Sequence, residues 1–203
     1  MNRYIYRLVA AVLAAITIVS CNDARKSETY RLLEDVDSYI EARPDSALAV
    51  LEGIDVEDLG SREEKAKYAL LMSMALDKNY IDRTDFEVLQ PAIDYYEDHG
   101  SATDKLRTFY YQGRIYYNRG EPEEAMECYV KSLDLGAGSN NLAAKARNYN
   151  AQSLLYYDYF NWEKIVECSL AAAECYKSLG NTDNYVRMLC RAAEGFSLLG
   201  DKE

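Results

Sequence analysis

The sequence has little of what most catalytic centres and most β-sheets require. It holds one histidine and three prolines among 203 residues. No serine elbow, no phosphate-binding glycine loop and no metal-binding pair of histidines occurs in it. No long stretch alternates apolar and polar residues with the period of two that marks a half-buried strand. We therefore expect an all-α protein that is not an enzyme and that holds neither a metal nor a cofactor.

Positive charge is also scarce. The 34 acidic residues outnumber the 23 basic ones and give a formal net charge of −11. Phosphate backbones and anionic lipid headgroups repel such a chain, so nucleic acid is not expected as a partner. An apolar fraction of 49% over this length suffices for a core in one domain or in one short repeat array.

Long apolar runs are missing except near the start. Leu8–Val19 is apolar and follows the basic residues Arg3 and Arg7. The run is shorter than the about 20 residues that span a bilayer, and a basic start followed by a short apolar run is typical of a secretory signal. The run ends in a sequence that resembles the lipobox of bacterial lipoproteins, Ile18, Val19, Ser20 and Cys21.

The lipobox resemblance implies a division of the N-terminal part. Residues 1–20 are then a lipoprotein signal peptide, Cys21 receives the lipid, and residues 21–29 form a polar tether. The resemblance also implies a place in the cell envelope, with the lipid holding the protein to a bacterial membrane. We expect the outer membrane, on its periplasmic or surface side. The alternative is an ordinary buried cysteine after a secretory signal.

After the tether, apolar residues recur at helical spacing. Residues 30–60 are expected to form a helical hairpin, whose first helix ends before Pro44 because the residue preceding a proline avoids the helical region. A helix over residues 61–77 and a partner over 82–97 should follow. Pro91 lies inside that partner and is expected to kink it.

The best-formed hairpin runs from Leu106 to Leu135. Its first helix is expected to end at Gly120, and its second begins at Pro122, where a proline loses no helical hydrogen bond. Two helices joined by so short a turn must lie antiparallel. The spacing of this hairpin then recurs along the chain.

Three kinds of residue repeat every 40 positions, and a constant period in this range is typical of a helical repeat array. They are a small residue (Gly113, Ser153, Ala193), a ring (Tyr116, Tyr156, Phe196) and a turn residue (Tyr80, Gly120, Phe160, Gly200). The period divides residues 61–203 into units of about 61–100, 101–140 and 141–180 and a half unit, 181–203. In the half unit the residues expected to face inward are Val186, Leu189, Ala193 and Phe196.

One unit resembles the tetratricopeptide repeat (TPR), although the period of 40 exceeds that family's usual 34. The residues that carry the resemblance are Phe109, Gly113, Tyr116, Ala125, Tyr129 and Ser132. The resemblance implies antiparallel helix pairs stacked as a right-handed solenoid, with a concave groove that holds a peptide or a partner protein. With the lipobox, the chain resembles the TPR lipoproteins of Gram-negative bacteria.

The family resemblance also implies which residues line the groove. They are Lys67, Arg107, Tyr110, Arg114, Tyr117, Arg147, Asn150, Tyr157 and Arg187. The four at the second position of successive first helices, Lys67, Arg107, Arg147 and Arg187, are all basic, and we call them the basic ladder. Guanidinium groups match carboxylates, so the ladder predicts an acidic peptide partner. The alternative is that each ladder cation pairs with an acidic residue of a neighbouring helix.

Two other functions stay open beside a protein scaffold. The groove tyrosines Tyr110, Tyr117 and Tyr157 could stack on sugar rings, which would make the chain a carbohydrate-binding lipoprotein. The chain could also be the N-terminal part of a larger regulatory TPR protein.

Four cysteines follow Cys21: Cys128, Cys168, Cys175 and Cys190. An oxidising periplasm would permit a disulfide, for example between Cys175 and Cys190. We favour the alternative that they pack as small buried residues.

Overall fold

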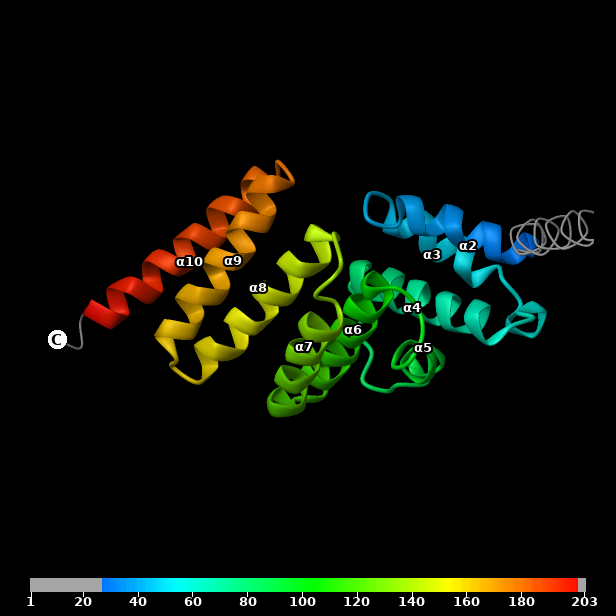
Figure 1. Cartoon of the computed structure of the whole chain (residues 1–203), viewed down its shortest axis with the longest axis horizontal. Helices are drawn as coiled ribbons and strands as arrows, with labels where there is room; N and C mark the ends of the chain where they lie inside the picture. Colours follow the sequence, from blue (N-terminus) through cyan, green and yellow to red (C-terminus); the bar gives the residue numbers. More distant parts are fainter. Residues whose placement is uncertain (1–26, 201–203) are drawn as a thin grey trace, which may run out of the picture.

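The computed structural model describes residues 27–200 (Figure 1). Its helices are α2 (Glu28–Tyr39), α3 (Pro44–Glu52), a 3₁₀ turn η1 (Val56–Asp58), α4 (Arg62–Lys78), α5 (Gln90–Tyr96), α6 (Ala102–Arg119), α7 (Pro122–Leu135), α8 (Leu142–Asp158), α9 (Trp162–Ser178) and α10 (Thr182–Gly200). No strand occurs between residues 27 and 200, which confirms the all-α prediction. The expected signal peptide and Cys21 lie outside the described residues. No helix in the described range is long and apolar enough to cross a membrane.

The period of 40 is visible in the helix starts. Helices α4, α6, α8 and α10 begin at residues 62, 102, 142 and 182. The residue before each start has a side-chain oxygen that accepts a hydrogen bond from the backbone N–H three positions on, and these residues are Ser61, Ser101, Asn141 and Asn181. Such a cap satisfies one of the N–H groups that the first turn of a helix leaves unpaired. Each unit therefore starts its first helix with the same device.

The turn inside each unit repeats as well. Tyr80, Gly120 and Phe160 have positive φ values of 60, 78 and 55°. The N–H of each following residue bonds back across the turn, at 3.0 Å, to the carbonyl of Leu76, Tyr116 or Tyr156. This is the left-handed helix ending that glycine favours, and a side chain there costs about 1–2 kcal/mol. The predicted turns at Tyr80, Gly120 and Phe160 are confirmed, and two of these positions carry a ring under strain. The turn predicted at Gly200 is wrong, because α10 continues through that residue.

The helix predicted over residues 82–97 is wrong in its length. The structure has an irregular connection over 79–89, and α5 begins only at Gln90 with Pro91 in its first turn. A proline in a helix interior removes a hydrogen bond and collides with the carbonyl four residues before it, whereas in the first turn it does neither. Pro91 therefore starts the helix and does not kink it.

Two apolar clusters meet at a polar seam. The larger one runs from α2 to α7 and includes Ala151 and Leu155 of α8, and the smaller one holds Ala146, Ala172 and Met188 of α8, α9 and α10. Between them Asn148, which has no exposed surface, donates to the Tyr129 carbonyl at 3.1 Å and to Ser132 Oγ at 2.8 Å. In Figure 1, α6 and α7 accordingly lie between the α8–α10 end and the α2–α5 end.

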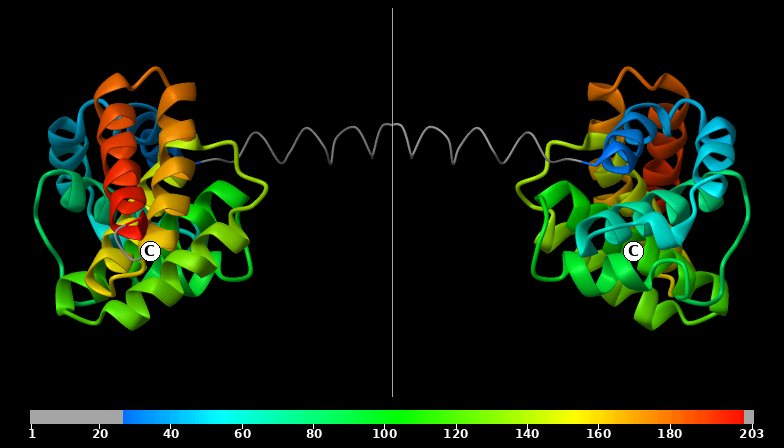
Figure 2. Two further views of the ribbon diagram at one scale, coloured as in Figure 1. Left: turned by 90° about the vertical axis from the view of Figure 1, so that its left-hand side faces the viewer. Right: turned by 90° about the vertical axis from the view of Figure 1, so that its right-hand side faces the viewer.

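The predicted inward face of α10 is also wrong. Met188, Ala192 and Gly195 pack toward the rest of the chain instead, and Figure 2 shows α9 and α10 side by side. A Cβ on Gly195 would come within 2.8 Å of Val166 of α9. The residues expected inside, Val186, Leu189, Ala193 and Phe196, are exposed. Their counterparts in α6 and α8 face the second helix of the same unit, and no such helix follows α10 within residues 27–200.

Candidate functional site

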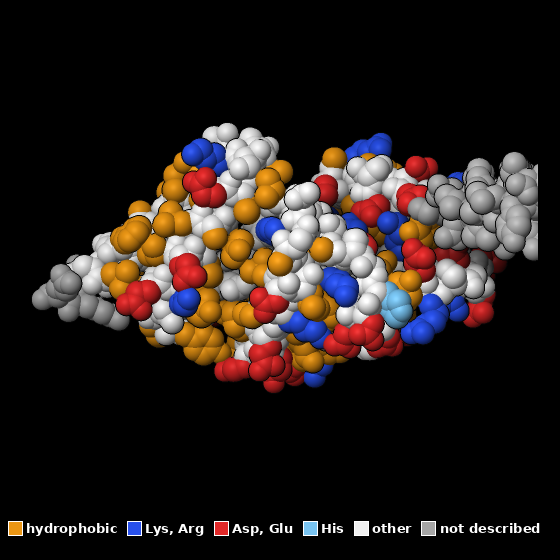
Figure 3. All heavy atoms as spheres, viewed as in Figure 1, with side chains coloured by type: hydrophobic (Ala, Val, Ile, Leu, Met, Phe, Trp, Pro, Cys, Tyr) orange, Lys and Arg blue, Asp and Glu red, His pale blue; other side chains and the backbone are white. Residues whose placement is uncertain are grey.

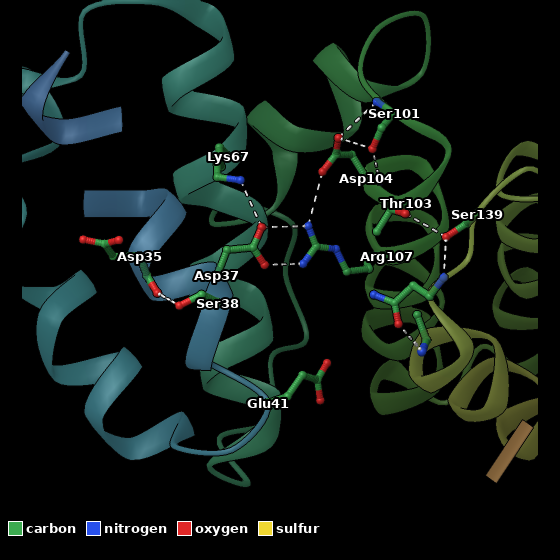
Figure 4. Close-up of polar contacts among 12 residues, drawn as sticks. Asp35, Asp37, Ser38, Glu41, Lys67, Ser101, Thr103, Asp104, Arg107 and Ser139 are labelled. Carbon is green, nitrogen blue, oxygen red and sulfur yellow. Dashed lines mark hydrogen bonds and ion pairs between the residues drawn. The ribbon is translucent and has the colours of Figure 1, made fainter. Parts of the chain in front are cut away.

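Three of the four ladder cations are in ion pairs with the N-terminal hairpin. Two of them meet Asp37 of α2 (Figure 4). The Asp37 carboxylate accepts from Lys67 Nζ at 3.0 Å and from both terminal nitrogens of Arg107, at 2.5 and 3.2 Å. Arg107 also donates to Asp104 at 3.2 Å and is only 6% exposed. A fork of two hydrogen bonds to one carboxylate is the strongest form of this pair.

The third cation, Arg147 of α8, reaches the residue after the α2 C-cap. Its two terminal nitrogens donate to Glu41 at 2.8 and 2.7 Å, and Lys78 of α4 donates to the same carboxylate at 2.6 Å. Asp37 and Glu41 thus tie α2 to α4, α6 and α8. We call this set, Asp37, Glu41, Lys67, Lys78, Arg107 and Arg147, the α2 clamp.

The α2 clamp contradicts the prediction that the basic ladder lines an open groove. Lys67, Arg107 and Arg147 already bind carboxylates of their own chain, as the alternative interpretation of the sequence stated. Arg187 of α10 is exposed and has no ion pair within the described range. The acidic partners were missed, although Asp37 and Glu41 stand four residues apart, the spacing that aligns side chains in a helix predicted to continue to just before Pro44. That spacing was the available signal.

The carboxylates of the clamp are held ionised. Burial by itself raises the pKa of Glu41, but hydrogen bonds and charges from Arg147 and Lys78 outweigh it and set the pKa at about 2. In the same way burial raises and Arg107 and Lys67 lower the pKa of Asp37, with a net lowering. Both groups therefore bind protons less readily in the folded chain than in the unfolded one.

Acid should weaken the fold through these two groups. A lowered carboxyl pKa gives a stabilisation that is complete above the ordinary pKa of 4.5 for Glu41 and is lost as the pH falls toward about 2. We expect the urea midpoint to fall steadily between pH 4.5 and pH 2. Glu41→Gln should flatten that fall, while Glu174→Gln, on the exposed side of α9, should leave it unchanged. If the urea midpoint fell equally with pH in the parent, in Glu41→Gln and in Glu174→Gln, the result would contradict the clamp.

Other predicted groove residues are also engaged. Arg114 donates from Nε to Asp77 at 2.8 Å, and Asn150 accepts from Arg191 at 2.7 Å. Tyr110 is buried, with 7% of its surface exposed, and its ring lies 5.7 Å from that of Tyr129. Burial raises the Tyr110 pKa to about 12. Its prediction as an open groove residue is therefore wrong, because the ring packs in the core.

Two predicted tyrosines do lie at the surface. Tyr117 is 41% exposed, and the Arg114 guanidinium lies 5.6 Å from its ring centre. Tyr157 is 38% exposed and donates its hydroxyl to Glu194 of α10 at 2.8 Å. Leu154, one turn before Tyr157 on α8, is 41% exposed.

Tyr157 belongs to a group of rings at the α8–α9 turn. The group is Tyr157, Tyr159, Phe160 and Trp162, and we call it the turn aromatic cluster. The Trp162 ring lies edge-on to Tyr157 at 5.6 Å and to Phe160 at 5.7 Å. Tyr159 is 49% exposed and Phe160 is 70% exposed. Figure 3 shows hydrophobic side chains gathered over this end of α8 and α9, at its lower left.

Phe160 is the most costly member of the cluster. Its φ of 55° belongs to the left-handed region, where the preceding unit has Gly120. Glycine would avoid both the backbone strain and the exposure of a large ring to water. Strained and exposed residues of this kind concentrate at functional sites. Sequence reasoning placed Phe160 as a turn residue and missed it as a candidate contact.

The four cysteines are free thiols in the structure. Cys128 and Cys168 are buried, as expected for small apolar residues, and burial raises the pKa of both to about 11. Cys175 is half-buried and Cys190 is exposed, without the disulfide between them that the sequence permitted. Between residues 27 and 200 no group of His, Cys, Asp and Glu is placed to hold a metal ion.

Comparison with known proteins does not show which family the chain belongs to. No family model matches the sequence, and no curated protein and no solved structure gives a significant match. The candidate site therefore rests on the geometry of the turn aromatic cluster.

Proposed function

We propose that this chain is a lipid-anchored scaffold of stacked, TPR-like helix pairs that binds a protein or peptide partner at the turn aromatic cluster. Three features that repeat every 40 residues support the stacking: the starts of α4, α6, α8 and α10, their capping side chains, and the left-handed turns at Tyr80, Gly120 and Phe160. A right-handed solenoid is the arrangement that such units form in the family that the sequence resembles. The lipobox around Cys21 supports the anchor.

Phe160 carries the proposal. An exposed ring in a left-handed turn lowers the stability of the free chain, and a contact outside the chain would offset this cost. Tyr80 has the same backbone conformation and is 93% exposed, but only Phe160 lies against a further ring, that of Trp162, among the described residues. Rings with polar tips beside it, Tyr157 and Tyr159, supply stiff contact area at little entropic cost, which suits a protein interface. Leu154 extends this surface along α8, and Tyr117 of α6 lines a surface hollow together with Asp158, which lies between Tyr157 and Tyr159 in the sequence. Arg187 is not part of this surface, because it lies near the start of α10, beside Tyr176 at the other end of α9.

Site-specific photo-crosslinking in the cell envelope tests the proposal. A photoreactive phenylalanine analogue replaces Phe160 in one full-length chain and Leu170 in another. Leu170 lies on α9 and is 39% exposed, so it is a matched surface control. We expect a discrete crosslinked protein from position 160 and none from position 170. Equal crosslinking at both positions, or none at either, would contradict a partner at the turn.

The same chain also tests the carbohydrate alternative, which Tyr157 and Trp162 keep open because sugar rings stack on aromatic faces. A glycan array is probed with the detergent-solubilised protein and with its Phe160→Ser variant. Saturable glycan binding that the variant loses would replace the protein partner by a carbohydrate. We expect no such binding.

A further inference from the structure

The open flank of α10 is a second apolar surface, distinct from the turn aromatic cluster. At the position of Leu189 the preceding unit has Tyr149, which is half-buried, and the unit before that has Phe109, which is fully buried. The other large apolar residues on this face of α10 are also more exposed than their counterparts. The residues Val186, Leu189 and Phe196 are 49, 37 and 56% exposed, whereas their counterparts in α6, Leu106, Phe109 and Tyr116, are buried or half-buried. We call Val186, Leu189, Ala193 and Phe196 the α10 flank.

The two preceding units show what covers such a flank. In α6 a Cβ on Gly113 would meet the Tyr129 ring of α7 at 2.5 Å and the Ala125 carbonyl at 3.1 Å. A large ring of the second helix therefore lies directly on the small residue of the first. The second helix is fixed again near its end, where Ser132 Oγ donates to the Leu106 carbonyl at 2.6 Å. A small residue between larger apolar ones is thus the mark of a helix-docking face in this chain.

The α10 flank has the same pattern of one small residue between larger apolar ones, but no second helix packs on it within residues 27–200. Ala193 stands where Gly113 and Ser153 stand, with Leu189 and Phe196 on either side of it. Nothing in the described part of the chain requires a small residue there, since Ala193 is exposed and α9 packs against the neighbouring face of α10, at Met188, Ala192 and Gly195. The face is also continuous with an interface that exists, because α10 lies beside α9 as α8 does.

We propose that the α10 flank docks an amphipathic helix of a partner protein, lying antiparallel to α10. The helix places a large ring over Ala193, as Tyr129 lies over Gly113. A small residue of the helix lets its backbone pass close to Ala193, as Ala125 does on α7, where the Ala125 carbonyl would lie 3.1 Å from a Cβ on Gly113. The inference goes beyond the proposed function, because the flank and the turn aromatic cluster share no residue and are tested with different substitutions. The two approach each other near Gly195, where an added Cβ would lie 3.4 Å from the Trp162 carbonyl.

A helix of this chain serves as the probe. A fluorescent peptide of residues 121–136, which contain α7, is titrated with the full-length protein in detergent. We expect saturable binding that Leu189→Glu with Phe196→Glu weakens at least tenfold. Because both side chains are exposed, this variant should fold. Leu170→Glu on α9 is the matched control and should bind as the parent does. A Tyr129→Ser peptide should also lose binding.

A covalent version raises the effective concentration of the probe. Residues 124–136 are appended after Glu203, because 200–203 stand in phase with 120–123. The appended helix should raise the midpoint of thermal unfolding by several degrees, and an appended helix with Tyr129→Asp should not. The proposal is overturned if both fusions have the same midpoint of thermal unfolding and the peptide binds the variant with Leu189→Glu and Phe196→Glu as tightly as the parent. A dimer of the parent chain that Leu189→Glu dissociates overturns it too, in favour of a second copy.

Discussion

Asp37→Ala should lower the free energy of unfolding by about 3–5 kcal/mol at neutral pH, the usual cost of leaving one member of a buried ion pair without its partner. Arg107 is only 6% exposed and would keep its charge against the weak single contact with Asp104. Lys67 would lose its carboxylate as well. Urea denaturation followed by circular dichroism measures the loss.

Asp35→Ala supplies the matched control. Asp35 lies on the same helix, two residues away, with an exposed side chain that points away from Asp37 in Figure 4. Its replacement should change stability by less than about 0.5 kcal/mol. A chain in which Asp37→Ala is as mild as Asp35→Ala would show that α2 is not clamped.

Phe109→Ala should cost about 3–5 kcal/mol, the range for removing a fully buried aromatic side chain. The Phe109 ring has no exposed surface, and Lys131 Nζ of α7 lies 4.1 Å from its centre. Chemical denaturation of the two chains at equal concentration gives the difference.

Leu189→Ala is the control at the equivalent position of α10, where the side chain is 37% exposed. It should cost less than about 1 kcal/mol in the isolated chain, because little packing is lost there. Once a helix docks on the α10 flank, the same substitution should become costly. Equal losses at positions 109 and 189 in the isolated chain would mean that the flank is already covered.

Local chemistry made much of the fold predictable. The left-handed turns follow from the recurrence of Tyr80, Gly120 and Phe160, and the helix starts follow from capping residues and from Pro122. The error at Pro91 has the same local origin. A proline inside an apolar helical pattern fits both a kink and a helix start, and the irregular residues before it decide the outcome only in three dimensions.

Contacts between distant segments were not predictable. The basic ladder was visible as a series in the sequence, but its partners Asp37 and Glu41 come from a helix outside that series. Tyr110 sits at a position that faces the groove in the family, yet its ring packs on Tyr129 and lies near Arg147 of α8 and Tyr176 of α9. For α10 the prediction assumed a second helix on this face, and because residues 27–200 contain none, Val186, Leu189, Ala193 and Phe196 are exposed.

The α2 clamp has a mechanical consequence. In a linear repeat array each unit touches only its neighbours, so such an array can unravel one unit at a time from either end. The clamp joins residues 70 and 106 positions apart, Asp37 with Arg107 and Glu41 with Arg147. A pull on α2 is therefore shared at once by α4, α6 and α8. If a lipid holds the N-terminal end to a membrane, the α2 clamp lies where the load enters.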